Sequence, residues 1–172
     1  VRSVDDLDNK SDWGVSGAYV YDATNPTGPS DIIVTPASPS NNKRPTWSWT
    51  AGTDAGSGVA KHEVRYKEAL GAWSGPVDVN APDVTWTPGF DLTDGTWEIG
   101  VTAVDGAGNK SAETTGGTYL LDTTGPGVPH TFVDPTPTPG NDTTPTWTWS
   151  APADAGVGLH ETAPYEVQIS LN

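Results

Sequence analysis

The sequence predicts an all-β fold made of antiparallel β-sandwiches that repeat in tandem with a period of about 100 residues. Three observations support this prediction. Short segments alternate between apolar and polar residues, proline and glycine clusters separate them, and blocks of sequence recur at one fixed offset. No stretch shows the period of about 3.6 residues that an amphipathic helix requires.

The recurrence is visible by eye. The opening residues VRSVDDLDNKS return as VTAVDGAGNKS at 101–111, and PTWSWTAGTDAGSG at 45–58 returns as PTWTWSAPADAGVG at 145–158. After an insertion of three residues, HEVRY at 62–66 matches YEVQI at 165–169. A period of this length is that of a whole domain, because solenoid units are much shorter.

The repeat divides the chain into three parts. Residues 1–24 match the end of a copy, residues 25–124 form one complete copy, and residues 125–172 match the front of a third. We therefore expect the native protein to be longer than this chain, with neighbouring copies of the repeat as its first partners.

Six segments of the complete copy have the pattern of strands. The clearest, TWEIGVTAV at 96–104, places Trp97, Ile99, Val101 and Ala103 on one face. Short strands separated by turns, within about 100 residues, are typical of a β-sandwich. The other five segments are residues 31–35, 46–50, 62–67, 83–87 and 118–122.

Trp47 and Trp49 share one face of their strand. We expect them in the core against Trp97 and Tyr66, because large aromatic side chains dominate sandwich cores. The alternative is an aromatic platform for sugar rings.

Composition excludes several classes of function. The chain has 22 Asp and Glu against 8 Lys and Arg, which argues against binding to nucleic acid or to an anionic membrane. It has no cysteine, which excludes a disulfide scaffold, a thiolate zinc site and a cysteine nucleophile. No apolar run approaches the roughly 20 residues of a membrane span, so no membrane insertion is expected in this segment.

Two blocks carry a family resemblance. EVRYKEALGAW at 63–73, with LTDGTWEIGVTAVDGAGNKS at 92–111, resembles fibronectin type III domains from the C strand to the F–G turn. The chain is also similar to the bacterial Ig-like repeats of large surface proteins. The segment TYLLDTTGPGVP at 118–129 resembles the junctions between repeats in those tandem arrays. The resemblance implies adhesin stalks and spacers, or accessory modules of secreted enzymes, and an extracellular, cell-surface or secreted location. Trp97 stands where the fibronectin pattern has a tyrosine.

Aspartates recur in pairs at the repeat offset, at the last turn, before the linker and after the tryptophan strand. The pairs are Asp5 and Asp105, Asp22 and Asp122, and Asp54 and Asp154. In an Ig-type sandwich the B–C and F–G loops lie at the end where the chain enters. We therefore expect Asp22, Asp54 and Asp105 to converge at one junction, and Asp122 with Asp154 at the next.

Carboxylates gathered in one place repel each other unless a cation neutralises them. Ca²⁺ suits this role, because it accepts six to eight oxygen ligands at about 2.3–2.6 Å in flexible geometry. Backbone carbonyls, Asn109 and water would complete the shell, and calcium at interdomain junctions is also what the resemblance implies. The alternative is that these aspartates only form turns.

No motif for catalysis is present: the sequence has no nucleophile elbow, no HExxH and no phosphate-binding loop. The sequence therefore predicts a non-catalytic structural repeat of an extended surface protein, stiffened by Ca²⁺. The alternative is a carbohydrate-binding or accessory module of a secreted polysaccharide-degrading enzyme, for which Trp13 and Trp73 in loop sequence are the candidate ligand-binding residues. Self-association remains open, because strands missing from a partial copy can come from a neighbour.

Overall fold

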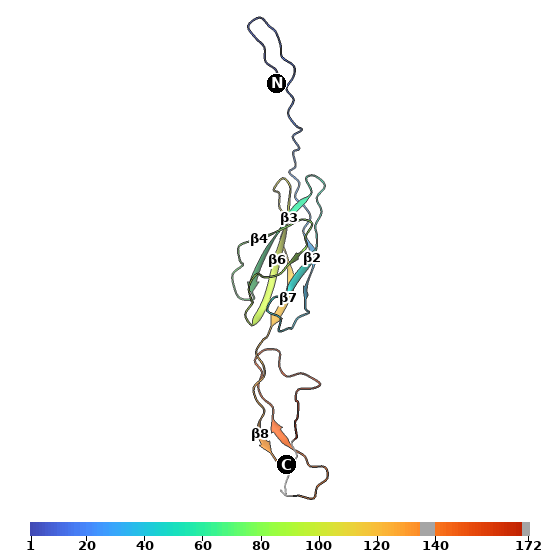
Figure 1. Cartoon of the computed structure of the whole chain (residues 1–172), viewed down its shortest axis with the longest axis vertical. Helices are drawn as coiled ribbons and strands as arrows, with labels where there is room; N and C mark the ends of the chain where they lie inside the picture. The colour runs from blue at the N-terminus through green and yellow to red at the C-terminus, as the bar shows by residue number, and fades with distance from the viewer. Residues whose placement is uncertain (135–139, 170–172) are drawn as a thin grey trace.

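The computed structural model of the chain describes residues 1–134 and 140–169. The molecule is a rod with three parts along its axis: a thin N-terminal segment, a compact central sandwich and a C-terminal part with one small sheet (Figure 1). None of the described residues is helical, and a search of them finds no helix that could cross a membrane.

The central sandwich has two antiparallel sheets. The three-stranded sheet has the order β1 (Ser30–Thr35), β2 (Thr46–Thr50), β5 (Thr85–Trp86). The four-stranded sheet has the order β4 (Val77–Asn80), β3 (Val59–Glu68), β6 (Gly95–Asp105), β7 (Thr114–Leu121). The predicted all-β sandwich is therefore confirmed. Strand β4 was not among the six expected segments, and the segment 83–87 forms a ladder at only two residues.

The core lies between the two sheets. Its buried residues are Trp47, Trp49, Val64, Leu92, Ile99, Val101, Tyr119 and Leu121. Trp47 and Trp49 are 1% and 4% exposed, so they are core residues and cannot offer a platform to a sugar. Their ring neighbours differ from those expected. Trp47 meets Trp86 at 5.6 Å and Tyr119 at 6.0 Å, and Trp49 meets His62 at 5.3 Å.

The reason for this difference is the strand order. Because β5 pairs with β2, Trp86 lies directly beside Trp47 in the ladder. The ring of Tyr66 stacks on that of Trp86 at 5.2 Å, and the ring of Trp97 lies 6.5 Å from that of Tyr66 at the edge of the core. The indole nitrogen of Trp97 donates a hydrogen bond to the carbonyl of Thr93 at 2.9 Å. Trp97 therefore makes a bond back to the upstream chain of the kind that a corner tyrosine makes in Ig-type sandwiches.

The C-terminal part repeats the pairing of the first two strands of the central sandwich. Strands β8 (His130–Val133) and β9 (Thr148–Ser150) pair in the register of β1 and β2, shifted by the repeat offset. The rings of Trp149 and Tyr165 meet edge-on at 5.3 Å, as those of Trp49 and His62 do. Residues 165–169, the counterpart of β3, form no ladder.

Candidate metal centre at the entry of the sandwich

Three aspartates meet where the N-terminal segment enters the central sandwich. Asp22 lies in that segment, Asp54 lies in the loop between β2 and β3, and Asp105 is the last residue of β6. One carboxylate oxygen from each residue lies within 4.8 Å of the other two. The structure thus brings together the three residues that the repeat and the sandwich topology place at this junction, which we call the first junction.

Asp105 organises the turn that follows β6. Its Oδ1 accepts the backbone amides of Ala107 at 2.9 Å and Asn109 at 2.8 Å, and its Oδ2 accepts the side-chain amide of Asn109 at 2.8 Å. The turn closes through Gly108, whose φ of 93° favours glycine. The same Asn109 amide donates to the carbonyl of Asp22 at 3.2 Å, so this turn holds the linker as well as the carboxylate.

Asp54 differs from the other two because one of its oxygens lacks a partner. Its Oδ2 accepts the amides of Gly56 at 3.0 Å and Gly58 at 2.8 Å. Its Oδ1 is buried and makes no hydrogen bond. A buried polar atom without a partner is costly and is rare in folded proteins. Asp54 belongs to the acidic cluster, so a cation bound there is a partner that fits a carboxylate with a free oxygen.

Asp22 attaches the linker to the loop of the sandwich. Its Oδ2 accepts the backbone amide of Ser57 at 2.8 Å and the Ser57 hydroxyl at 2.7 Å. Its Oδ1 accepts the amide of Thr24 at 3.0 Å. The carboxylate lies directly over Gly56, where any Cβ would collide with it. Ser57 Oγ also accepts the amide of Ala107, which joins the loop to the turn after β6.

Hydrogen bonding keeps two of these carboxylates charged. The Ser57 hydroxyl, followed by the amides of Thr24 and Ser57, lowers the pKa of Asp22. Burial acts to raise the pKa of Asp105, but the bonds from Asn109, Ala107 and Gly108 together outweigh it and the pKa falls. Both groups are therefore anionic at neutral pH. A cluster that offers only carboxylates, without histidine or cysteine, suits a hard cation such as Ca²⁺ and not zinc.

The second junction, at Asp122 and Asp154, repeats part of this arrangement. Asp122 Oδ2 accepts the amide of Val157 at 2.8 Å and Asp154 Oδ1 accepts that of Gly156 at 3.4 Å. A Cβ on Gly156 would again collide with the linker carboxylate. Asp122 and Asp154 are the counterparts of Asp22 and Asp54, and the repeat offset places the counterpart of Asp105 beyond Asn172.

Asp5 lies in the exposed turn near the N-terminus, apart from the other five candidate metal ligands. Its Oδ1 accepts the amides of Leu7 and Asn9, both at 2.9 Å, and its Oδ2 accepts the Asn9 side chain at 2.8 Å. The bond from the Asn9 side chain is the main cause that lowers the pKa of Asp5. The turn therefore has the form of the turn at Asp105, with Asp8 at φ 62° in the place of Gly108.

Comparisons with known proteins add a likeness in fold. The sandwich is similar to fibronectin type III domains. A solution structure of the fibronectin type III domain of the human collagen α1(XX) chain is 23% identical and covers 66% of this chain and 98% of that one, with a TM-score of 0.46. A fibronectin type III-like protein from Clostridium thermocellum is 16% identical over 58% of this chain and 94% of that one, with a TM-score of 0.40. Module A71 of titin from human cardiac muscle is also 16% identical. It covers 58% of this chain and 93% of that one, with a TM-score of 0.44. No family model and no curated protein sequence matches.

The two candidate sugar-binding tryptophans lie in different settings. Trp73, in the loop after β3, is half-buried and has the Arg65 guanidinium 5.4 Å and the Lys67 ammonium 4.9 Å from its ring centre. Trp13, in the N-terminal segment, is 65% exposed, with the Arg2 guanidinium 4.7 Å from its ring centre. A sugar ring stacking on the covered face of either would have to displace a cation.

Sequence reasoning identified the three acids of the first junction but not the residues that hold them. Ser57 and Gly56 are the main omissions. Gly56 could have been found from the sequence, since Gly156 stands at the same place in the next copy. Ser57 could not have been found in this way, because its counterpart is Val157. The bond that the two copies have in common is donated by the backbone amide to the linker aspartate.

Proposed function

We propose that the chain is a non-catalytic structural segment of an extended extracellular or cell-surface protein, such as an adhesin stalk or a filament spacer. In this proposal Ca²⁺ at the first junction fixes the linker to the following sandwich. The observation that carries it is the convergence of Asp22, Asp54 and Asp105 within 4.8 Å, with a buried oxygen of Asp54 that has no partner.

The geometry explains how a cation would stiffen the chain. Asp22 belongs to the linker, whereas Asp54 and Asp105 belong to two loops of the sandwich. Without a cation, the three charges repel each other and favour a linker that swings away. A shared cation reverses this effect, because it is bound only when all three segments are in place, and its binding energy stabilises that arrangement. The dissociation constants of extracellular calcium modules lie near 10⁻⁴–10⁻³ M, to order of magnitude.

The test compares the whole chain in millimolar calcium, in EGTA and in millimolar magnesium. We expect calcium to raise the melting temperature and to narrow the distribution of lengths measured by small-angle scattering. Magnesium should do less, because it requires near-ideal octahedral geometry. If melting and scattering are identical in calcium and in EGTA, the proposal is wrong.

A carbohydrate-binding or accessory role is the second candidate, and the exposure of Trp13 is the observation that favours it. Binding to a glycan array would support this role if Trp13→Ala or Trp73→Ala abolishes it. If the unmodified chain binds no glycan on the array, the carbohydrate-binding role is wrong and the structural role stands alone.

A further inference from the structure

The central sandwich holds the chain where it leaves as well as where it enters. Strand β7 ends at Leu121, which is 1% exposed and lies opposite Gly95, the first residue of β6. On the other side of β7, the backbone amide of Asp122 donates to the carbonyl of Ser40 at 3.0 Å. The backbone is therefore fixed between two neighbours as far as Asp122. We call residues 122–127, which follow the end of β7, the outgoing linker.

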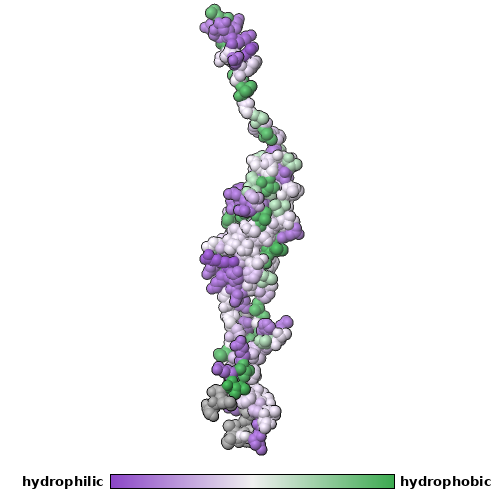
Figure 2. Space-filling model, turned by 45° about the vertical axis from the view of Figure 1, so that its right-hand side comes forward, coloured by the Kyte–Doolittle hydropathy of each residue, from purple (hydrophilic) through white to green (hydrophobic). Residues whose placement is uncertain are grey.

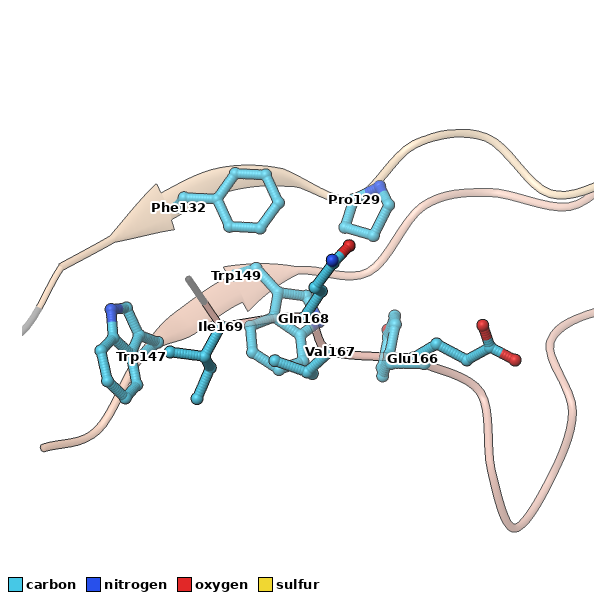
Figure 3. A pocket seen from close by; sticks show the side chains of 9 residues that line it. Pro129, Phe132, Trp147, Trp149, Glu166, Val167, Gln168 and Ile169 are labelled. Atoms are coloured by element: carbon cyan, nitrogen blue, oxygen red, sulfur yellow. The ribbon is translucent and has the colours of Figure 1, made fainter. Parts of the chain in front are cut away.

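This linker carries the connection to the C-terminal part. The rod narrows between the central sandwich and that part (Figure 1 and Figure 2). Beyond the linker, the side chains of Phe132, Trp149 and Val167 line one space between β8, β9 and the segment 165–169, as the inner face of another sandwich would (Figure 3). The orientation of the next sandwich therefore depends on the outgoing linker and on the residues that hold it.

Asp94, the residue before β6, receives three hydrogen bonds from the outgoing linker. Its Oδ1 accepts the backbone amide of Thr123 at 3.0 Å and the Thr123 hydroxyl at 2.7 Å. Its Oδ2 accepts the hydroxyl of Thr124 at 2.8 Å. Hydrogen bonds to an ionised acceptor are roughly twice as strong as those between neutral groups. Both oxygens of one carboxylate thus hold two successive residues of the linker.

These bonds favour the charged form of the carboxylate. The hydroxyls of Thr123 and Thr124 and the amide of Thr123 lower the pKa of Asp94, and together they outweigh its desolvation. The charge of Lys43 adds a weaker effect in the same direction. Asp94 is therefore anionic at neutral pH, and it holds the linker without help from a metal ion.

We propose that Asp94 clamps the outgoing linker to the sandwich that the linker leaves, so that neighbouring sandwiches bend only beyond Thr124. The clamp differs in chemistry from the first junction. There, three carboxylates gather around a candidate cation site, whereas Asp94 is already paired with three hydrogen-bond donors. The inference therefore does not rest on the proposed calcium function.

The hinge lies at Gly125. The bonds from Asp94 end at Thr124, and the amide of Gly127 donates to the carbonyl of Ala153 in the following part at 3.0 Å. Between these contacts, the ring of Pro126 restricts its own φ. A Cβ at Gly125 would meet nothing within 4 Å, so this residue has both open space and the freest backbone of the linker.

One contact crosses the hinge. The Asp122 carboxylate, on the near side of Gly125, accepts the amide of Val157 in the following part at 2.8 Å. This bond limits how far the next sandwich can swing. Asp94 and Asp122 thus have separate roles: the first sets the direction in which the chain leaves a sandwich, and the second restrains the sandwich that follows.

Strand β6 connects the two held ends of the central sandwich. It runs for 11 residues from Gly95 to Asp105, so Asp94 stands directly before it and Asp105 is its last residue. Such a strand is about 35 Å long. It pairs with β3 on one side and with β7 on the other. One strand paired on both sides therefore joins the anchor of the incoming linker to the anchor of the outgoing linker.

The test measures backbone order in the linker by ¹⁵N relaxation of the whole chain, in EGTA and in calcium. Order parameters of about 0.85 mark a rigid backbone, and values below about 0.6 mark a flexible one. We expect Thr123 and Thr124 to be near the rigid value in both buffers, and Gly125 to be lower than either. Asp94→Ala should lower the values of both threonines to below about 0.6.

Asp91→Ala is the matched control. Asp91 lies in the same loop and carries the same charge, but its carboxylate pairs with the Arg44 guanidinium at 2.7 Å. This variant should leave the order of the linker unchanged. The amide shifts of residues 25–121 show whether each variant has kept the fold of the sandwich.

A second variant leaves Asp94 in place, so it tests the clamp even if Asp94→Ala disturbs the start of β6. Thr123→Val combined with Thr124→Val removes both hydroxyls at nearly constant shape. We expect the order of the linker to fall, but by less than in Asp94→Ala, because the amide at position 123 keeps its acceptor.

Order parameters at 123 and 124 that are unchanged in Asp94→Ala and in the double valine variant would overturn the clamp, as would an equal loss in Asp91→Ala. Residues 123 and 124 that are ordered in calcium but mobile in EGTA would overturn its independence of the cation. A Gly125 as rigid as the two threonines would overturn the position of the hinge. If melting and scattering ignore calcium while Asp94→Ala releases the linker, the clamp stands and the proposed calcium function fails.

Discussion

Ser57 holds the carboxylate of Asp22 through two hydrogen bonds, one from its backbone amide at 2.8 Å and one from its hydroxyl at 2.7 Å. The two residues belong to different parts of the chain, so these bonds attach the N-terminal linker to the sandwich before any cation is considered. At the second junction Val157 supplies only the amide. The contact between the linker aspartate and this loop residue therefore has one more hydrogen bond at the first junction than at the second.

Replacing Ser57 by the valine of the next copy tests this attachment. We expect Ser57→Val to raise the pKa of Asp22, because the serine hydroxyl is the largest cause of its lowering. The pKa of Asp94 serves as the internal control, since it is lowered by hydrogen bonds from Thr123 and Thr124, which do not contact Ser57. Titration of the carboxyl carbons by NMR measures both groups in one sample. An unchanged Asp22 would show that the hydroxyl does not hold it in solution.

Asp54→Asn tests the oxygen that lacks a partner. The variant keeps the shape of the side chain but removes its charge, so we expect calcium affinity to fall by about tenfold or more, equivalent to about 1.4 kcal/mol or more. In EGTA the same variant should be as stable as the unmodified chain or more stable, because it relieves repulsion among three carboxylates. Titration calorimetry and thermal melting measure the two effects. Asp12→Asn, which loses the same charge in the N-terminal segment, is the control and should change neither.

Gly56→Ala tests the close approach of the linker. A Cβ at this position collides with the Asp22 carboxylate, whereas at Gly75 it would meet nothing within 4 Å. We expect the alanine at 56 to displace the linker, weaken calcium binding and cost about 1–3 kcal/mol, the range typical of overpacking. Gly75→Ala should leave calcium binding unchanged. Equal behaviour of the two variants, by calorimetry and melting, would contradict the geometry of the first junction.

The pH dependence of calcium binding follows from the lowered pKa values of Asp22 and Asp105. Each carboxylate contributes its hydrogen bonds fully above the unfolded pKa of about 3.9, and loses them as pH falls through the lower folded value. Protons compete with calcium over the same range. We therefore expect affinity that is flat from neutral pH to about pH 5 and that falls steeply below about pH 4. Loss of binding between pH 7 and 6 would point to a histidine ligand instead.

The sequence was sufficient for the fold and for the meeting of the three acids, because both depend on period and topology. Alternation identified β6, and the repeat offset together with loop placement brought Asp22 to Asp54 and Asp105. Strand β4 was missed because its four residues, VDVN at 77–80, are too few to show a pattern. The free oxygen of Asp54 was not predictable either, since it depends on how one carboxylate rotates within a glycine-rich loop.

His62 offers a test of the core that is independent of calcium. The ring is 1% exposed, packs edge-on against Trp49 and makes no hydrogen bond from either nitrogen. Burial lowers its pKa, more than the nearby backbone of Asp83 raises it. The unfolded chain takes up a proton near pH 6.5 whereas the folded chain resists it, so folding stability should decrease as pH falls below about 6.5.

His62→Phe keeps an aromatic ring against Trp49 and removes the titrating group. We expect the melting temperature of the unmodified chain in EGTA to fall between about pH 7.5 and about pH 5.5, and that of the variant to stay level over this range. His130 and His160 lie outside the core, so His130→Phe is the matched control and should keep the slope. A slope that persists in His62→Phe would assign the proton uptake to another group and would show that His62 can be protonated within the folded core.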